Sequence, residues 1–117
     1  MDAGKIEDPK SGMQGNGWCF DVLVHSRRIA GRWLAAKAEV FDGDAGAQLQ
    51  IAAERYAQIA ETCEDGLECT WDLTPGPDRI EEWTTEMRGR QIARLESARV
   101  HDRAAIRAID QALKALR

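Results

Sequence analysis

The chain has 117 residues, of which 44% are hydrophobic and 31% charged, and its formal net charge is −4. This length supports one domain with a modest core, and the composition excludes an intrinsically disordered chain. The net negative charge, and the acidic residues interleaved with the basic ones near the C-terminus, argue against nucleic-acid binding. No apolar stretch is long enough for a membrane span and no export signal is evident, so we expect a cytoplasmic protein without a membrane segment.

Residues 1–17 are rich in glycine and polar side chains, so we expect a disordered tail before a single helical domain over residues 18–117. Over residues 18 to about 41 the apolar residues recur with a helical period and predict the first helix. One stripe of this helix contains Trp18, Cys19, Val22, Ile29, Trp33, Ala36 and Val40. We expect this stripe to face the core.

A second helix is predicted over residues 44–64. Asp44 is a suitable N-cap residue, and Gly66 suits the left-handed position that follows a helix. The apolar face of this helix contains Leu49, Ala52, Ala53, Tyr56, Ile59, Ala60 and Cys63. The three cysteines of the chain form no CxxC or CxxH pair, which excludes a zinc site and a disulfide framework. We expect reduced thiols, with a bridge between Cys63 and Cys69 as the alternative.

The segment LECTWDLTPGPD contains two prolines and no helical period, so it predicts a connection. A third helix is then expected over residues 78–116. We favour a helix that is continuous through Gly89 over a break there into a four-helix arrangement, because one glycine inside a helix costs only about 1 kcal/mol. Its apolar arc contains Ile80, Trp83, Met87, Ile92, Leu95, Ala98, Ala105, Ile106, Ile109, Leu113 and Leu116. The predicted fold is all-α, an antiparallel bundle of three helices with a long last helix. Because that helix would overhang its two partners and expose apolar surface, we expect a homodimer formed through it.

Asp102 lies near the middle of the apolar arc of the third helix, where an unpaired carboxylate would cost several kcal/mol if buried. It therefore needs a cation, other hydrogen-bond donors or water, and the candidate cations are Arg99, Lys37 and His25. Three interpretations remain open. The carboxylate belongs to a satisfied polar layer that fixes the register of the helices, it lines a ligand-binding cleft, or it faces solvent where the helix bends outward.

For the second interpretation we expect a cleft between helices that binds a small molecule or a peptide. Its lining would combine the acid with aromatic rings, an arrangement that suits cationic or aromatic ligands. The candidate ligand-binding residues are Asp102, Arg99, Trp33, Trp83 and Tyr56. No cofactor and no catalytic residue are expected in this reading.

Acidic residues near the ends of the second and third helices support an enzyme alternative. Carboxylates from two helices can share a magnesium ion, and the candidate ligands are Glu61, Glu64, Glu81, Glu82 and Glu86. The six residues EEWTTE resemble the EExxE motif of the all-α, MazG-like nucleotide pyrophosphohydrolases, which implies a magnesium-dependent phosphohydrolase. The spacing here is EExxxE, and the ExxD motif of that family does not follow.

The sequence contains no GxSxG motif, no P-loop and no glycine-rich dinucleotide turn. We therefore favour a non-enzymatic, homo-oligomeric helical protein with a binding cleft over the magnesium-dependent enzyme. A third possibility is an interaction protein in which a different partner covers the long helix.

Overall fold

A computed structural model describes the backbone of residues 9–66 and 84–117, and the side chains from Trp18 onward within those ranges. The described part is entirely helical, with α1 over Pro9–Val40, α2 over Gly43–Glu64 and α3 over Thr85–Ala115. The molecule is elongated, with principal extents of 54 × 27 × 21 Å. The all-helical class and the bundle of three helices that the sequence predicts are therefore confirmed.

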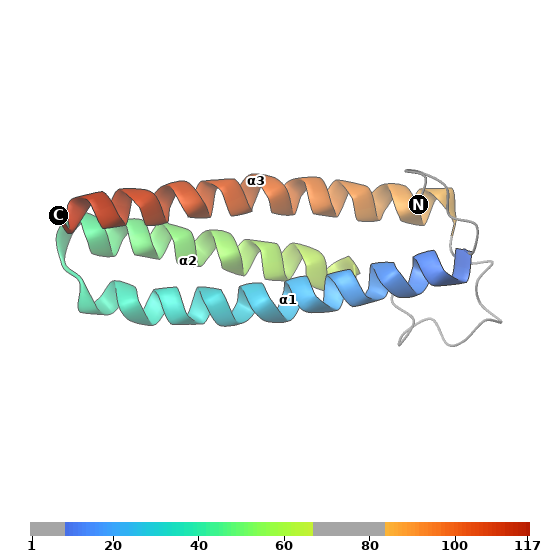
Figure 1. Cartoon of the computed structure of the whole chain (residues 1–117), viewed down its shortest axis with the longest axis horizontal. Coiled ribbons are helices and arrows are strands. Elements are labelled where there is room, and N and C mark those ends of the chain that lie inside the picture. Colours follow the sequence, from blue (N-terminus) through green and yellow to red (C-terminus); the bar gives the residue numbers. More distant parts are fainter. Residues whose placement is uncertain (1–8, 67–83) are drawn as a thin grey trace.

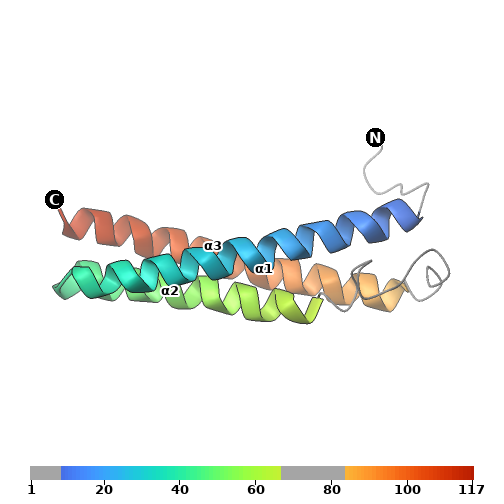
Figure 2. The ribbon, with the colours of Figure 1, turned by 90° about the horizontal axis from the view of Figure 1, so that it is seen from below.

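The helix α2 lies between α1 and α3 and runs antiparallel to both, so that α1 and α3 run parallel to each other (Figure 1). Nowhere in the described ranges do Cα atoms of α1 and α3 come within 8 Å of each other. Figure 2 shows that α1 also crosses the direction of α3 obliquely. Each outer helix therefore packs its backbone closely against α2 alone.

The helix ends follow local sequence chemistry. Pro9 begins α1, where its missing N–H costs nothing, so this helix starts nine residues before the predicted Trp18. The turn into α2 passes through Gly43, whose φ of 68° is readily adopted only by glycine. Asp42, rather than the predicted Asp44, occupies the N-cap position of α2. At the start of α3 the Thr84 side chain accepts a hydrogen bond from the backbone N–H of Met87 at 3.1 Å.

The helix α3 is continuous through Gly89, as the sequence predicts. The part of the predicted helix over residues 78–83 lies outside the described residues. The relative lengths differ from the expectation, because α1 has 32 residues and α3 has 31, whereas α2 has 22. The shortest helix is thus the central one, and α3 is not longer than α1.

The core consists of two clusters arranged along the bundle. One contains Leu34, Leu49, Ala52, Ala53, Ala105, Ala108 and Ala112. The other contains Phe20, Val24, Ile59, Cys63 and Ala98. The half-buried ring of Tyr56 packs against both clusters and so lies where they meet. The predicted face of α2 is confirmed, since every predicted residue on it is buried or half-buried.

The face of α1 that packs against α2 is not the predicted one. The predicted stripe faces solvent, with Trp18 exposed at 72%, Ile29 at 67% and Trp33 at 59%. The opposite face carries Phe20, Val24, Gly31 and Leu34, and these residues are buried. Gly31 explains the choice, because a Cβ there would lie 3.3 Å from the carbonyl oxygen of Ala53, so the two helices approach closely along this face.

Gly66 is required for space and not for a left-handed backbone. Among the described residues only Gly43 has a positive φ, and the C-cap residue Asp65 is in the right-handed region. A Cβ on Gly66 would lie 2.6 Å from the Phe20 ring and 2.8 Å from Oε1 of Gln91. A side chain here would displace the buried phenyl ring.

None of the helices described here combines the length and the apolar character needed to cross a membrane.

Glycine substitutions test this packing. In Gly46→Ala the new Cβ would overlap the backbone carbonyl oxygen of Phe41, so we expect a loss of about 2 kcal/mol or more in the free energy of unfolding. Gly89 has no atom within 4 Å of a Cβ, so Gly89→Ala should stabilise the protein by about 1 kcal/mol. Urea unfolding followed by circular dichroism measures both, and equal effects of the two substitutions would contradict the packing described for Gly46.

Candidate functional site

Asp102 is paired with Arg27 of α1. Nε of Arg27 donates to Oδ1 of Asp102 at 3.1 Å, and Nη2 donates to Oδ2 at 2.9 Å. The two side chains are 30% and 26% exposed. Such a two-pronged guanidinium–carboxylate pair is a strong, geometrically specific interaction. The carboxylate on the apolar arc therefore links the two helices whose backbones do not meet.

This polar layer lies where the two core clusters join. The Arg27 guanidinium carbon lies 6.0 Å from the centre of the Tyr56 ring, and Nη1 donates to Oγ of Ser26 at 3.1 Å. The hydrogen bonds to Asp102 and its charge raise the pKa of Arg27 above its ordinary value, against an opposing effect of burial. The layer thus holds a permanent cation that neutralises Asp102 from within the chain.

The sequence missed Arg27 as the partner of Asp102. Of the three cations proposed, His25 lies 3.2 Å from Asp21, and Lys37 lies over the Trp33 ring at 5.4 Å from its centre. The third, Arg99, is exposed. Arg27 lies on the packed face of α1 beside Phe20 and Val24. Because the sequence predicted that the opposite face of α1 packs inward, Arg27 was not among the predicted partners of Asp102.

The predicted ligand-binding residues are only partly brought together. Asp102 and Tyr56 meet around Arg27, as described above. Trp33 points outward from α1, and Arg99 is exposed on α3. Trp83 lies outside the described residues. A cleft formed by all five residues stays a prediction, and the described pair is already bridged by an arginine.

A second buried polar contact closes the end of the bundle near Gly66. Gln91 is 2% exposed, and its Nε2 donates to the carbonyl oxygen of Gly66 at 3.0 Å. Its Oε1 accepts from Nη1 of Arg94 at 2.6 Å. Within the described ranges no buried side-chain nitrogen or oxygen lacks a hydrogen bond. The buried polar groups on the arc of α3 are therefore satisfied within the chain.

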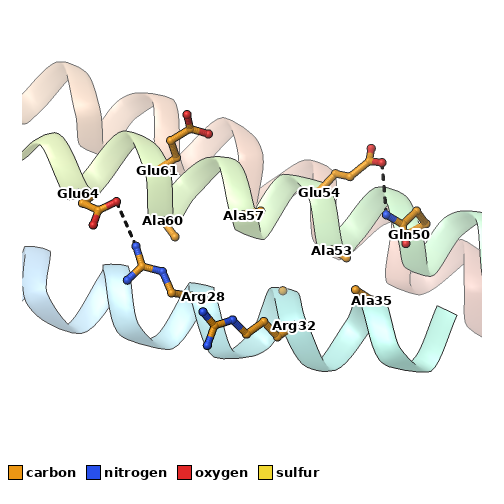
Figure 3. Close-up of a pocket in the computed structure, with 11 residues that line it drawn as sticks. Arg28, Arg32, Ala35, Gln50, Ala53, Glu54, Ala57, Ala60, Glu61 and Glu64 are labelled. Atoms are coloured by element: carbon orange, nitrogen blue, oxygen red, sulfur yellow. Dashed lines mark hydrogen bonds and ion pairs between the residues drawn. The ribbon is translucent and has the colours of Figure 1, made fainter. Parts of the chain in front are cut away.

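A groove of about 400 Å³ runs along the junction of α1 and α2 (Figure 3). Its floor consists of small residues, and its walls carry opposite charges, arginines from α1 and glutamates from α2. Arg28 already reaches across to Glu64, with Nη2 3.2 Å from Oε2. The groove is lined by Arg28, Gly31, Arg32, Ala35, Gln50, Ala53, Glu54, Ala57, Ala60, Glu61 and Glu64. None of the predicted ligand-binding residues lines it.

The acidic residues proposed as magnesium ligands lie in different places. Glu61 and Glu64 both line the groove on α2, whereas Glu86 is exposed in the first turn of α3. Glu81 and Glu82 lie outside the described residues. Within residues 9–66 and 84–117 no three histidine, cysteine, aspartate or glutamate side chains come together as a metal site would need.

The helix α3 exposes a second apolar face beside the one that packs on α2. Its residues alternate in spacing between three and four along the sequence, which is the heptad pattern of a coiled-coil seam. We call this face the α3 stripe, and it consists of Ile92, Leu95, Arg99, Asp102, Ile106, Ile109, Leu113 and Leu116. Ile106 is 60% exposed and Leu113 is 52% exposed, whereas Asp102 and Ile109 are half-buried at the edge toward the core.

A scan against protein-family models found no match to the chain, and searches of curated proteins and of solved structures found none either. The arguments for function therefore depend on the geometry of the chain itself.

A double-mutant cycle tests the Arg27–Asp102 pair. Arg27→Met and Asp102→Leu should each lower the free energy of unfolding by about 1–3 kcal/mol, because each leaves a partly buried charge without its partner. The double variant should lose less than the sum of the two single effects, because no charge is then left over. Strictly additive losses in urea unfolding would show that the pair does not couple α1 to α3.

The thiol of Cys63 gives a pH-dependent prediction. Burial raises its pKa above the ordinary value, and the nearby Arg27 and Arg94 only partly oppose this. A group whose pKa is raised on folding holds its proton longer in the native state, so stability falls as the pH rises through the range in which the unfolded thiol ionises. We expect the free energy of unfolding to decline above about pH 8.5, with a shallower decline in Cys63→Ala. An identical slope in both proteins would contradict the effect.

Proposed function

We propose that this chain is a helical interaction protein that works as a homodimer, with the α3 stripe as the contact surface. The observation that carries the proposal is the exposure of five large apolar side chains of the stripe at coiled-coil spacing, namely Ile92, Leu95, Ile106, Leu113 and Leu116. From Ile92 to Leu116 the stripe extends over roughly 36 Å at the rise of an α-helix. A cytoplasmic location is part of the same proposal.

The exposed side chains support association because apolar surface is more stable out of water. Each large aliphatic side chain of the stripe would contribute about 1.5–3 kcal/mol on full burial, before the costs of association. Contiguous apolar surface that is rimmed by polar residues is typical of protein interfaces. Covering the α3 stripe would therefore remove more apolar surface from water than covering a single exposed apolar residue.

A second copy is the favoured occupant of the stripe because the stripe is self-complementary in charge. It contains one basic residue, Arg99, and one acidic residue, Asp102, among six aliphatic ones. A two-fold axis can bring the same patch of both copies together, so each charge can meet an opposite charge. An entirely apolar partner would bury Arg99 without a counter-charge.

The groove between α1 and α2 supports a second candidate function, the binding of a peptide or small molecule. Its volume lies within the usual range of ligand sites, and its walls would suit a ligand that carries both charges. The ion pair between Arg28 and Glu64 already neutralises two of the charges that such a ligand would contact, so we rank this candidate below association through α3.

Substitutions on α3 test the homodimer. Ile106→Arg places a charge in the stripe and should raise the dimer dissociation constant by about tenfold or more. Val100→Arg is the matched control, because Val100 is 61% exposed on the same helix but lies off the stripe. Light scattering with sedimentation over a range of concentrations measures the dissociation constant, and circular dichroism checks that both variants fold.

A wild-type chain that stays monomeric at high concentration would overturn the homodimer and favour a different protein as partner. Ile29→Arg provides a further control, because Ile29 belongs to the exposed face of α1. If this substitution abolished the dimer and Ile106→Arg did not, the contact surface would be α1 and not the α3 stripe.

A further inference from the structure

The two charged residues of the α3 stripe lie together in its middle and are three residues apart. Ile92 and Leu95 precede them, and the four remaining residues of the stripe, all aliphatic, follow them. Arg99 is exposed and makes no hydrogen bond or ion pair with the described residues. Asp102 is bound to Arg27, but its side chain keeps 26% of its surface exposed. The stripe therefore presents a free guanidinium next to an accessible carboxylate.

A parallel pairing of two α3 helices would place like charges together. In a parallel coiled coil, each seam residue shares a layer with the same residue of the partner. Arg99 would then face the partner's Arg99, and Asp102 would face the partner's Asp102. The contact between the two Arg99 guanidinium groups is repulsive in an interface that excludes water, whereas each Asp102 is already paired with Arg27. Arg99 therefore disfavours the parallel orientation.

From these charges we infer that the second copy lies antiparallel on the α3 stripe, with Arg99 of each copy against the partner's Asp102. This inference rests on the homodimer proposed above. In the same register Leu95 faces the partner's Ile106, and Ile92 faces the partner's Ile109. The two-fold axis then passes between residues 100 and 101, close to the middle of α3, so the two helices overlap over their full length.

The carboxylate can serve both arginines at once. Arg27 occupies one acceptor position on each oxygen of Asp102, and a carboxylate offers about four such positions. Arg27 approaches from α1, on the core side of the stripe, whereas the partner's Arg99 would approach from the open side. Each Asp102 would then lie between a guanidinium of its own chain and one of the second copy.

The competing antiparallel register is shifted by one heptad. It would bring Leu95 against the partner's Leu113, which buries more aliphatic surface near the C-terminus. It would also place Arg99 against the partner's Ile109 and Asp102 against the partner's Ile106. Arg99 would then be buried against an aliphatic side chain without a counter-charge, which is costly, whereas Asp102 keeps Arg27 in either register. Arg99 therefore selects the register with the Arg99–Asp102 contacts.

Disulfide cross-linking distinguishes the orientations. In a background with Cys19→Ser and Cys69→Ser, chains carrying Leu95→Cys are mixed with chains carrying Ile106→Cys, under reducing conditions that allow subunits to exchange. Oxidation should then give a heterodimer of the two chains and little cross-linking of either chain with itself. The four residues changed here lie outside the Arg27–Asp102 pair, and Leu95 and Ile106 are exposed.

The other outcomes overturn the inference in separable ways. Self-cross-linking of either chain through its introduced cysteine would show a parallel pairing, because the native Cys63 that both chains keep is buried. Preferential cross-linking of Leu95→Cys with Leu113→Cys would show the shifted register. A dimer by light scattering that yields none of these cross-links would place the interface elsewhere. A monomer by light scattering, with no cross-links, would reject the homodimer itself.

A charge substitution tests the same contact by a different readout. Arg99→Glu should raise the dimer dissociation constant about tenfold or more, because each Asp102 would meet a second carboxylate. Arg107→Glu is the matched control, since it makes the same change of charge on an exposed residue of α3 that lies off the stripe. Equal weakening by both substitutions would mean that only the net charge of α3 matters, and would contradict the specific contact.

Discussion

The arrangement of this molecule depends on one constraint. The outer helices α1 and α3 are too far apart for close backbone packing, so they contact each other only where long side chains bridge the distance in the described ranges. Among the helices that the structure describes, the central helix α2 is the shortest and is the only one that packs closely on both others. The bond between Arg27 and Asp102 is the strongest described link from α1 to α3. This ion pair lies between the two apolar clusters. It neutralises the Asp102 carboxylate and fixes the position of α1 along α3.

The sequence was sufficient for the class of fold and for α2, and insufficient for α1. The helix α2 has one apolar face, so the spacing of its apolar residues identifies the face that packs inward. The helix α1 has two, one with Trp18 and Trp33 and one with Phe20 and Leu34. Hydrophobicity favours the face with the tryptophans, but Gly31 allows close approach of α2 on the other face. The steric fit of Gly31 against α2 therefore determines which face of α1 packs inward, and the spacing of apolar residues in the sequence carries no information about that fit.

The candidate site followed the same division. Asp102 was identifiable from the sequence, because a carboxylate on an apolar arc needs a partner. The partner was not identifiable, since Arg27 is 75 residues away and its position depends on which face of α1 packs inward. The exposed α3 stripe was visible only as part of a wide arc. The structure divided that arc into small residues that pack on α2 and large aliphatic residues that face solvent.

The order of the helices has a consequence for how quickly the chain can reach its native state. Backbone contacts join helices that follow each other in sequence, and in the described ranges the first and third helices make none between them. Short average sequence separation between contacting residues lowers the entropic barrier to folding, and helical proteins of this kind fold in microseconds to milliseconds. Arg27 and Asp102 are 75 residues apart in sequence, so the ion pair at the centre closes a long loop, and the α1–α2 and α2–α3 pairings shorten that loop.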